Sequence, residues 1–320
     1  MAKVNNKDVL QSYILTTAKY EFSVYEKRIL YRIIELLQEH TEGKRLNNKY
    51  KVELDLFGDT QISMPINAFL KDSQDKNYVQ VKKALRDLES KSIEYEDDRM
   101  WKLLRVIQAP SVNKYDSFVE FRLDKKIYDA FLDFSKGFRK YELVTAMQFE
   151  SIYAMRFYEI LSGQKTPLTY TIDALKDIFG ISNKYKYVKD FRIYVLDTAK
   201  NELDKCSPYT FDYKFNKQGR AFHSVTLFPK YQPQFRDDNL EKHDLQKQVS
   251  LSWDLPKNVA DYLKHNFGFT TDGIKNNIDL FKKAHSEIDL IQFLASIKGK
   301  VRESNNPQGY VIGAIKKQLN

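Results

Sequence analysis

The chain has 320 residues, a formal net charge of +9 and 42% hydrophobic residues. This length and apolar content fit two or three folded domains and exclude both a single small module and a disordered chain. The excess of Lys and Arg favours a polyanionic partner, although charge alone does not separate nucleic acid from a membrane surface.

The first 138 residues carry one set of elements that is typical of a winged helix. A long amphipathic helix is expected over residues 22–39, where Ser23 and Glu26 could form a capping box. A strand at 50–56 and a short helix at 66–71 follow. A candidate recognition helix is predicted at 77–90, and strands are expected at 93–96, 101–108 and 117–123.

The same order of elements returns between residues 139 and 232. A long helix is expected at 147–161, a short strand at 168–170 and a short helix at 172–179, which Gly180 would end. The strongest pattern lies at 185–203, because apolar residues recur there at the spacing of one helical face. Ser182 and Asn183 offer capping chemistry for this helix. Two strands, 209–215 and 221–228, then form a basic hairpin.

The last part of the chain is less regular. Residues 233–250 are polar and are interpreted as a linker, in part helical. Residues 251–320 return to helical spacing and predict a small helical tail domain. The fold class predicted from the sequence is therefore helix-rich α+β, with two tandem winged helix-turn-helix domains (1–138 and 139–232), a linker and the tail.

In a winged helix, the second helix of the helix-turn-helix enters the DNA major groove and the hairpin contacts the backbone. Polar and basic residues on the outward faces of these elements are thus the candidate DNA contacts. In the second domain they are Lys184, Lys186, Tyr187, Lys189, Arg192, Ile193, Lys214, Lys217 and Arg220. In the first domain they are Lys82, Lys83, Arg86, Arg99 and Lys102.

Other chemistry finds little support in the sequence. The five histidines are scattered, the single cysteine Cys206 excludes a multi-cysteine metal site, and no phosphate-binding glycine loop is present. No cofactor, metal or catalytic residue is expected. Because no apolar run reaches the roughly 20 residues of a membrane span and the N-terminus lacks the core of a signal peptide, a cytoplasmic protein without a membrane partner is expected.

The second half also carries a family resemblance. MQFESIYAMRFYEIL (147–161), IDALKDIFGI (172–181), YKYVKDFRIYVLDTAKNEL (185–203) and FDYKFNKQGRAFHSVTLFP (211–229) resemble the second winged-helix domain of the iteron-binding plasmid replication initiators. The first half resembles that family's first domain more loosely. One departure concerns residues 192–194, where family members often carry arginines and this chain has only Arg192.

The resemblance implies a bacterial protein that binds direct repeats of double-stranded origin DNA as a monomer. It also implies cooperation with the host initiator ATPase and the replicative helicase, and a monomer–dimer equilibrium. Two alternatives from other classes stay open at the level of sequence. One is a transcription regulator without a role in replication, and the other is a rolling-circle nickase or primase.

Overall fold

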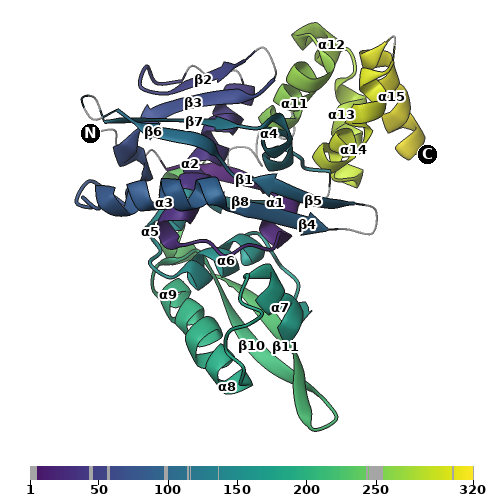
Figure 1. The fold of residues 1–320 in the computed structure, drawn as a ribbon. Helices are drawn as coiled ribbons and strands as arrows, with labels where there is room; N and C mark the ends of the chain where they lie inside the picture. The colour runs from purple at the N-terminus through teal and green to yellow at the C-terminus, as the bar shows by residue number, and fades with distance from the viewer. Residues whose placement is uncertain are drawn as a thin grey trace.

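The computed structural model describes residues 6–42, 46–55, 58–96, 100–113, 115, 117–135, 137–242, 244, 255–304 and 306–319. Figure 1 shows an upper body formed by the first half of the chain, a lower body that ends in a projecting hairpin, and a helical group beside the upper body. The predicted fold class, two winged-helix domains and a helical tail, is confirmed.

The first domain is arranged around α2 (Val24–Thr41), which is buried on all sides from Glu26 to Leu37. The expected capping box is present: the Ser23 hydroxyl accepts the N–H of Glu26, and the Glu26 carboxylate accepts the N–H of Ser23. The other helices of this domain are α1 (Tyr13–Thr17), the 3₁₀ turn η1 (Ile66–Phe69), α3 (Tyr78–Ser90) and α4 (Lys125–Phe131).

The strands of the first domain form three small antiparallel sheets. A four-stranded sheet has the order β2 (Lys51–Leu54), β3 (Thr60–Pro65), β7 (Phe118–Leu123) and β6 (Gln108–Val112). The wing pairs β4 (Ser92–Glu96) with β5 (Trp101–Arg105), and β1 (Asp8–Ser12) pairs with β8 (Phe138–Glu142). The single strand predicted at 101–108 was wrong, since β5 ends at Arg105 and Gln108 begins β6.

The segment expected to open the second domain forms two short helices. The single helix predicted at 147–161 was wrong: α5 (Leu143–Gln148) ends before a three-residue break, Phe149 to Ser151, and α6 (Ile152–Leu161) follows. The Ser151 hydroxyl caps α6 by accepting the N–H of Ala154. Side chains of α2 and α9 bind the backbone of this break.

The helix-turn-helix of the second domain comes next. It consists of β9 (Leu168–Thr171), α7 (Ile172–Ile178), α8 (Val188–Phe191), the π-helical segment η2 (Arg192–Asp197) and α9 (Thr198–Cys206). The wing strands β10 (Tyr209–Gln218) and β11 (Ala221–Tyr231) pair with each other, and β11 also pairs with β9. One continuous apolar core runs through both domains.

The segment after the second wing returns to the first domain. After η3 (Pro233–Phe235), Arg236 forms ion pairs with Asp8 of β1 at 2.9 Å, with Glu142 at the end of β8 at 2.7 Å and with Asp244 at 2.8 Å. Residues 238–242 are helical. The described part of the expected linker is thus bound to the first domain, because Arg236 satisfies carboxylates from both strands of the β1–β8 pair.

The tail is a bundle of short helices with a core of its own. Its helices are α11 (Lys257–Phe267), α12 (Thr271–Lys275), α13 (Ile278–Glu287), α14 (Leu290–Arg302) and α15 (Pro307–Gln318). Phe134 of the first domain is part of this core, and Leu10 and Phe138 pack against it. The tail therefore rests on the first domain, on the side of the molecule away from α3 and α8 in Figure 1.

Candidate nucleic-acid interface

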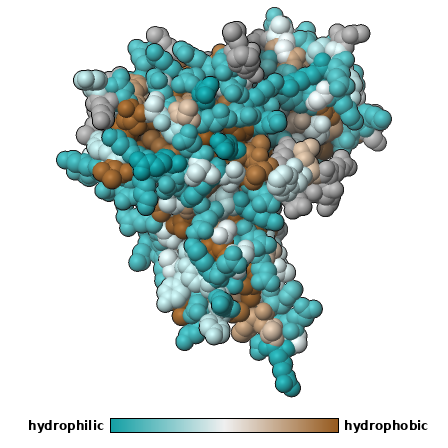
Figure 2. All heavy atoms as spheres, viewed as in Figure 1, coloured by the Kyte–Doolittle hydropathy of each residue, from teal (hydrophilic) through white to brown (hydrophobic). Residues whose placement is uncertain are grey.

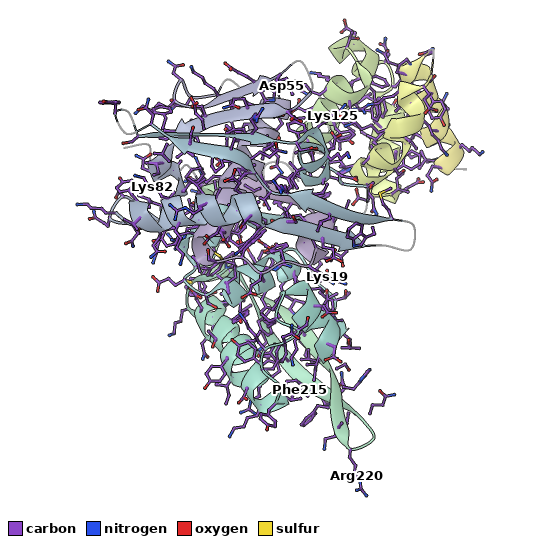
Figure 3. The ribbon with its side chains drawn as sticks, in the orientation of Figure 1. Lys19, Asp55, Lys82, Lys125, Phe215 and Arg220 are labelled. Carbon is purple, nitrogen blue, oxygen red and sulfur yellow. The ribbon has the colours of Figure 1, made fainter. Side chains whose placement is uncertain are left out.

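The helix α3 has the two faces that the sequence predicts. Val81, Ala84, Leu85 and Leu88 are buried, so the basic residues between them must point outward. Lys82, Lys83 and Arg86 are exposed, and none of them forms an ion pair with any residue that the structure describes. Lys82 lies on the outer side of the helix in Figure 3.

The recognition element of the second domain starts later than predicted. Tyr187 is the N-cap of α8 and provides no side-chain cap, so the proposed capping by Ser182 and Asn183 was wrong. The Ser182 hydroxyl instead donates to the carboxylate of Asp177 at the end of α7. Tyr185 adopts a left-handed backbone conformation (φ 53°) in the turn.

The middle of this element is π-helical, which the sequence did not indicate. The wider turn of η2 lets Val195 and Leu196 both enter the core, while Arg192 and the next two residues stay exposed. The Thr198 hydroxyl donates to the Ile193 carbonyl at 3.0 Å. A π-helical insertion of this kind is frequent at functional sites.

Four predicted contact residues form one exposed surface on this element. Lys186, Tyr187, Lys189 and Ile193 are all exposed, Ile193 at 36% and Tyr187 at 74%. Neither lysine forms an ion pair within the described residues. Tyr194 was missed by sequence reasoning, yet it is 56% exposed and stacks on Tyr185 at a centroid distance of 5.9 Å.

Two other predicted contacts already have protein partners. Lys184 forms an ion pair with Glu21 of the first domain, so it joins the two domains as well as lying beside the interface. The guanidinium of Arg192 lies 3.6 Å from the Asp197 carboxylate, and its side chain is half exposed. Ideal helical spacing would place Arg192 beside the apolar stripe, but its side chain is exposed to solvent.

The second wing carries its basic residues at and near its tip. Lys214, Lys217 and Arg220 are exposed, and Arg220 lies at the far end of the projecting hairpin in Figure 3. The tight turn uses Gly219 in a left-handed conformation (φ 65°), which glycine adopts without strain. The Lys217 ammonium lies 5.3 Å from the centre of the Phe222 ring.

The first wing is different in character. Arg99 lies outside the described residues, and so does the side chain of Lys102. On the described part of this hairpin Trp101 and Leu103 are exposed, and the Trp101 indole donates to the Glu94 carboxylate at 3.0 Å. The described residues of the first wing therefore offer exposed apolar groups beside a single exposed cation, Arg105.

Together, α3, the element α8–η2–α9 and the second wing are suited to binding a polyanion with successive grooves, such as a nucleic-acid duplex. Both recognition elements present unpaired cations, the second wing extends a basic tip, and the face in Figure 2 is largely hydrophilic over α3 and at the end of the hairpin. Among the described residues, no three His, Cys, Asp or Glu side chains are grouped so that they could hold a metal ion. None of the described helices is long and apolar enough to cross a membrane.

Comparisons with known proteins agree with this geometry. A model of the initiator replication protein, first winged helix, matches residues 8–162, and a model of the initiator Rep protein, second winged helix, matches residues 171–228. Among solved structures, the fold is similar to the crystal structure of Pi initiator protein in complex with iteron DNA. That match has 14% identity and a TM-score of 0.51, over 69% of this chain and 95% of the other.

The tail lies beyond both matched ranges, and the two ranges together span well over half of the chain in the order of the family. The resemblance seen in the sequence is thereby confirmed, and the chain belongs to the family of initiator replication proteins that carry two winged-helix domains.

Proposed function

We propose that this protein initiates replication of a plasmid or similar mobile element by binding direct repeats in double-stranded origin DNA. The observation that carries the proposal is the pair of exposed basic recognition elements, α3 and α8–η2–α9, on two winged helices in the order of the initiator family. The similar Pi initiator protein was crystallised with iteron DNA, which supports the same type of ligand here.

The mechanism we propose is one of positioning. Each recognition element would occupy one major groove, where Lys186, Lys189 and Ile193 of the second domain face base edges. The tip of the second wing would contact phosphates, which orient the protein without reading sequence. Binding at adjacent repeats would bend or loosen neighbouring A·T-rich DNA.

An initiator of this kind is expected to work through protein partners and without a catalytic site. The protein would act without catalysis of its own, in the bacterial cytoplasm, with a host initiator ATPase and the replicative helicase as partners. It would also exchange between a monomer that binds repeats and a dimer. The tail, held on the first domain away from both recognition elements, leaves the DNA-facing surface open and offers a separate surface for a protein partner.

The test uses DNA that flanks the protein's own gene. The full chain should bind a fragment with direct repeats of about two helical turns more tightly than a random fragment of equal length. Replacing Lys82, Lys83 and Arg86 by Ala should weaken this binding. A control that replaces the exposed tail residues Lys316 and Lys317 should not. Equal affinity for repeats and random DNA would refute the proposal, and metal-dependent cleavage of single strands would favour the nickase.

A further inference from the structure

The break between α5 and α6 is bound by charged side chains from two directions. Arg28, on α2 of the first domain, donates to the Met147 carbonyl at 2.9 Å and to the Phe149 carbonyl at 3.2 Å. Glu202, on α9 of the second domain, accepts the N–H groups of Glu150 at 2.7 Å and Ser151 at 2.9 Å. The break interrupts the helical hydrogen-bond ladder, and these side chains take its free donors and acceptors.

Each of these side chains is also tied to one recognition element. Arg28 lies 3.6 Å from Asp75, whose carboxylate accepts the N–H groups of Lys71 and Asn77 in the turn before α3. Glu202 is itself part of α9, the continuation of the second recognition element. The path from one recognition element to the other therefore runs through Asp75, Arg28, the break and Glu202.

The contacts of this path restrict movement because the break is held by four hydrogen bonds of 2.7–3.2 Å and Arg28 is ion-paired with Asp75. Arg28 and Asp75 are nearly inaccessible to solvent, so the guanidinium cannot replace its protein partners by water. The planar guanidinium of Arg28 donates to two carbonyls and faces the Asp75 carboxylate, a three-way contact whose geometry is more rigid than that of a lysine ammonium. The Lys71 ammonium adds a contact of 2.7 Å to the side chain of Glu150 in the same break.

A second contact steadies the other end of the second helix-turn-helix. Gly180, which ends α7, lies so close to the backbone of Tyr20 and Glu21 that a Cβ atom there would approach within 2.7 Å. Lys184 pairs with Glu21 at the same junction. The second helix-turn-helix is thus held at the Tyr20–Glu21 backbone before α8, and at the break between α5 and α6 through α9.

We propose that Arg28 and Glu202 are positioning residues that fix the distance and the helical phase between α3 and α8–η2–α9. They thereby determine the spacing between two half-sites that one protein molecule binds. The predicted effect on half-site spacing rests on the proposed function. The predicted effect on the distance between the two recognition elements can be measured without DNA.

The substitution Glu202→Gln is the sharpest test, because it keeps the shape of the side chain and replaces one acceptor by an NH₂ donor that faces a backbone N–H. The matched control is Asp204→Asn on the same helix. Asp204 accepts from Lys200 at 2.7 Å and from the Thr210 hydroxyl at 2.5 Å, so its contacts stay inside the second domain. Both substitutions remove one negative charge, and any general electrostatic effect on DNA binding is therefore shared.

The first readout is affinity for a series of repeats in which the two half-sites are moved apart by one or two base pairs. Each added pair rotates one groove by about 35° relative to the other. The wild-type protein and Asp204→Asn should lose about tenfold or more in affinity at two added pairs. Glu202→Gln should bind the native spacing more weakly and show a much flatter response, with unchanged affinity for an isolated half-site. A general loss of stability would lower all affinities in proportion and leave the spacing preference intact.

The second readout is the distance distribution between spin labels on the full chain without DNA. The labels are placed at the exposed positions Val79→Cys and Asn201→Cys in a Cys206→Ala background. Glu202→Gln should broaden the distribution, and Asp204→Asn should not. If Glu202→Gln melts far below the wild type, Arg28→Lys, which keeps the charge and loses the three-way contact, replaces it.

The outcomes separate the two ideas. If Glu202→Gln keeps both the sharp spacing preference and the narrow distance distribution, the positioning role is refuted. If the wild-type protein fails to distinguish repeats from random DNA, the proposed function fails, and the label distances alone then decide whether Arg28 and Glu202 hold the two elements together.

Discussion

Lys189 provides the clearest test at the scale of a residue. Its side chain is exposed on the surface formed with Lys186 and Ile193, without an ion pair in the described chain. If it reads a base edge, Lys189→Ala should cost about 1–3 kcal/mol on the specific repeat and less on random DNA. Competition binding measures both values. Equal losses on the two DNAs would leave Lys189 as a phosphate contact only.

A second prediction for a single residue concerns Arg236, which lowers the pKa of the Asp8 carboxyl group. Burial would raise the pKa of Asp8, but its hydrogen bonds to Arg236 and the charge of Lys140 outweigh burial and hold the pKa below 3.8. Because the folded pKa is lowered, the stabilisation is complete well above pH 3.8 and is lost as the pH falls through the folded value.

Arg236→Gln should therefore reduce the free energy of unfolding by about 2–3 kcal/mol at pH 7, and by less as the pH falls below 3.8. Denaturant unfolding at a series of pH values measures the difference. A loss that stays constant from pH 7 to pH 3 would mean that Asp8 is not the group stabilised by Arg236.

Some features of the helices could be predicted from the sequence, and the break between α5 and α6 could not. The Ser23–Glu26 capping box, the left-handed Gly180 and the inward stripe of α3 follow local rules, and all are present. The break at Phe149 could not be foreseen, because Phe149 is itself buried and continues the apolar spacing. The backbone N–H and C=O groups of the break form hydrogen bonds with Arg28 and Glu202, which are distant in sequence. The break therefore depends on tertiary contacts that no local sequence pattern shows.

The π-helical segment escaped prediction for a related reason. One residue is added to the turn, but buried residues occur on both sides of the insertion, so the apolar stripe from Phe191 to Leu203 looks uninterrupted. Ideal helical spacing places Arg192 beside this stripe, and its exposure follows from the insertion. A helical wheel drawn with ideal spacing therefore identifies the recognition element and still misplaces one of its exposed residues.

The second wing allows a test at the scale of an element. Lys217 and Arg220 lie on either side of Gly219 at the tip of the hairpin and should contact phosphates. Replacing both by Ala should weaken binding to every DNA and reduce the salt dependence of log K by about 1–2 units. Titration of affinity against salt concentration measures the slope. An unchanged slope would show that the hairpin stays away from the DNA backbone.

At the scale of the whole molecule, the tail is connected more closely than its polar linker suggested. Arg236 binds the segment after the second wing to the first domain, and Phe134 belongs to the tail core. A chain that ends at residue 244 keeps the Arg236 ion pairs, whereas a chain that ends at residue 235 removes them.

The shorter chain should therefore melt at a lower temperature than the chain that ends at residue 244, and both should bind the repeats with similar affinity when folded. Thermal unfolding and repeat binding measure the two properties. A plasmid that depends on either chain should fail to replicate if the tail carries a partner surface. Normal replication with the tail removed would contradict that role.

In the proposed function, one molecule reads two successive major grooves with α3 and α8–η2–α9. A methylation-protection footprint on a single repeat tests it most directly, because guanine N7 lies in the major groove. Protection should appear in two grooves about one helical turn apart on one face of the DNA. One region should be lost when Lys82, Lys83 and Arg86 are replaced, and the other when Lys186 and Lys189 are replaced. Protection of a single groove by the wild-type protein, or the same footprint from both variants, would contradict it.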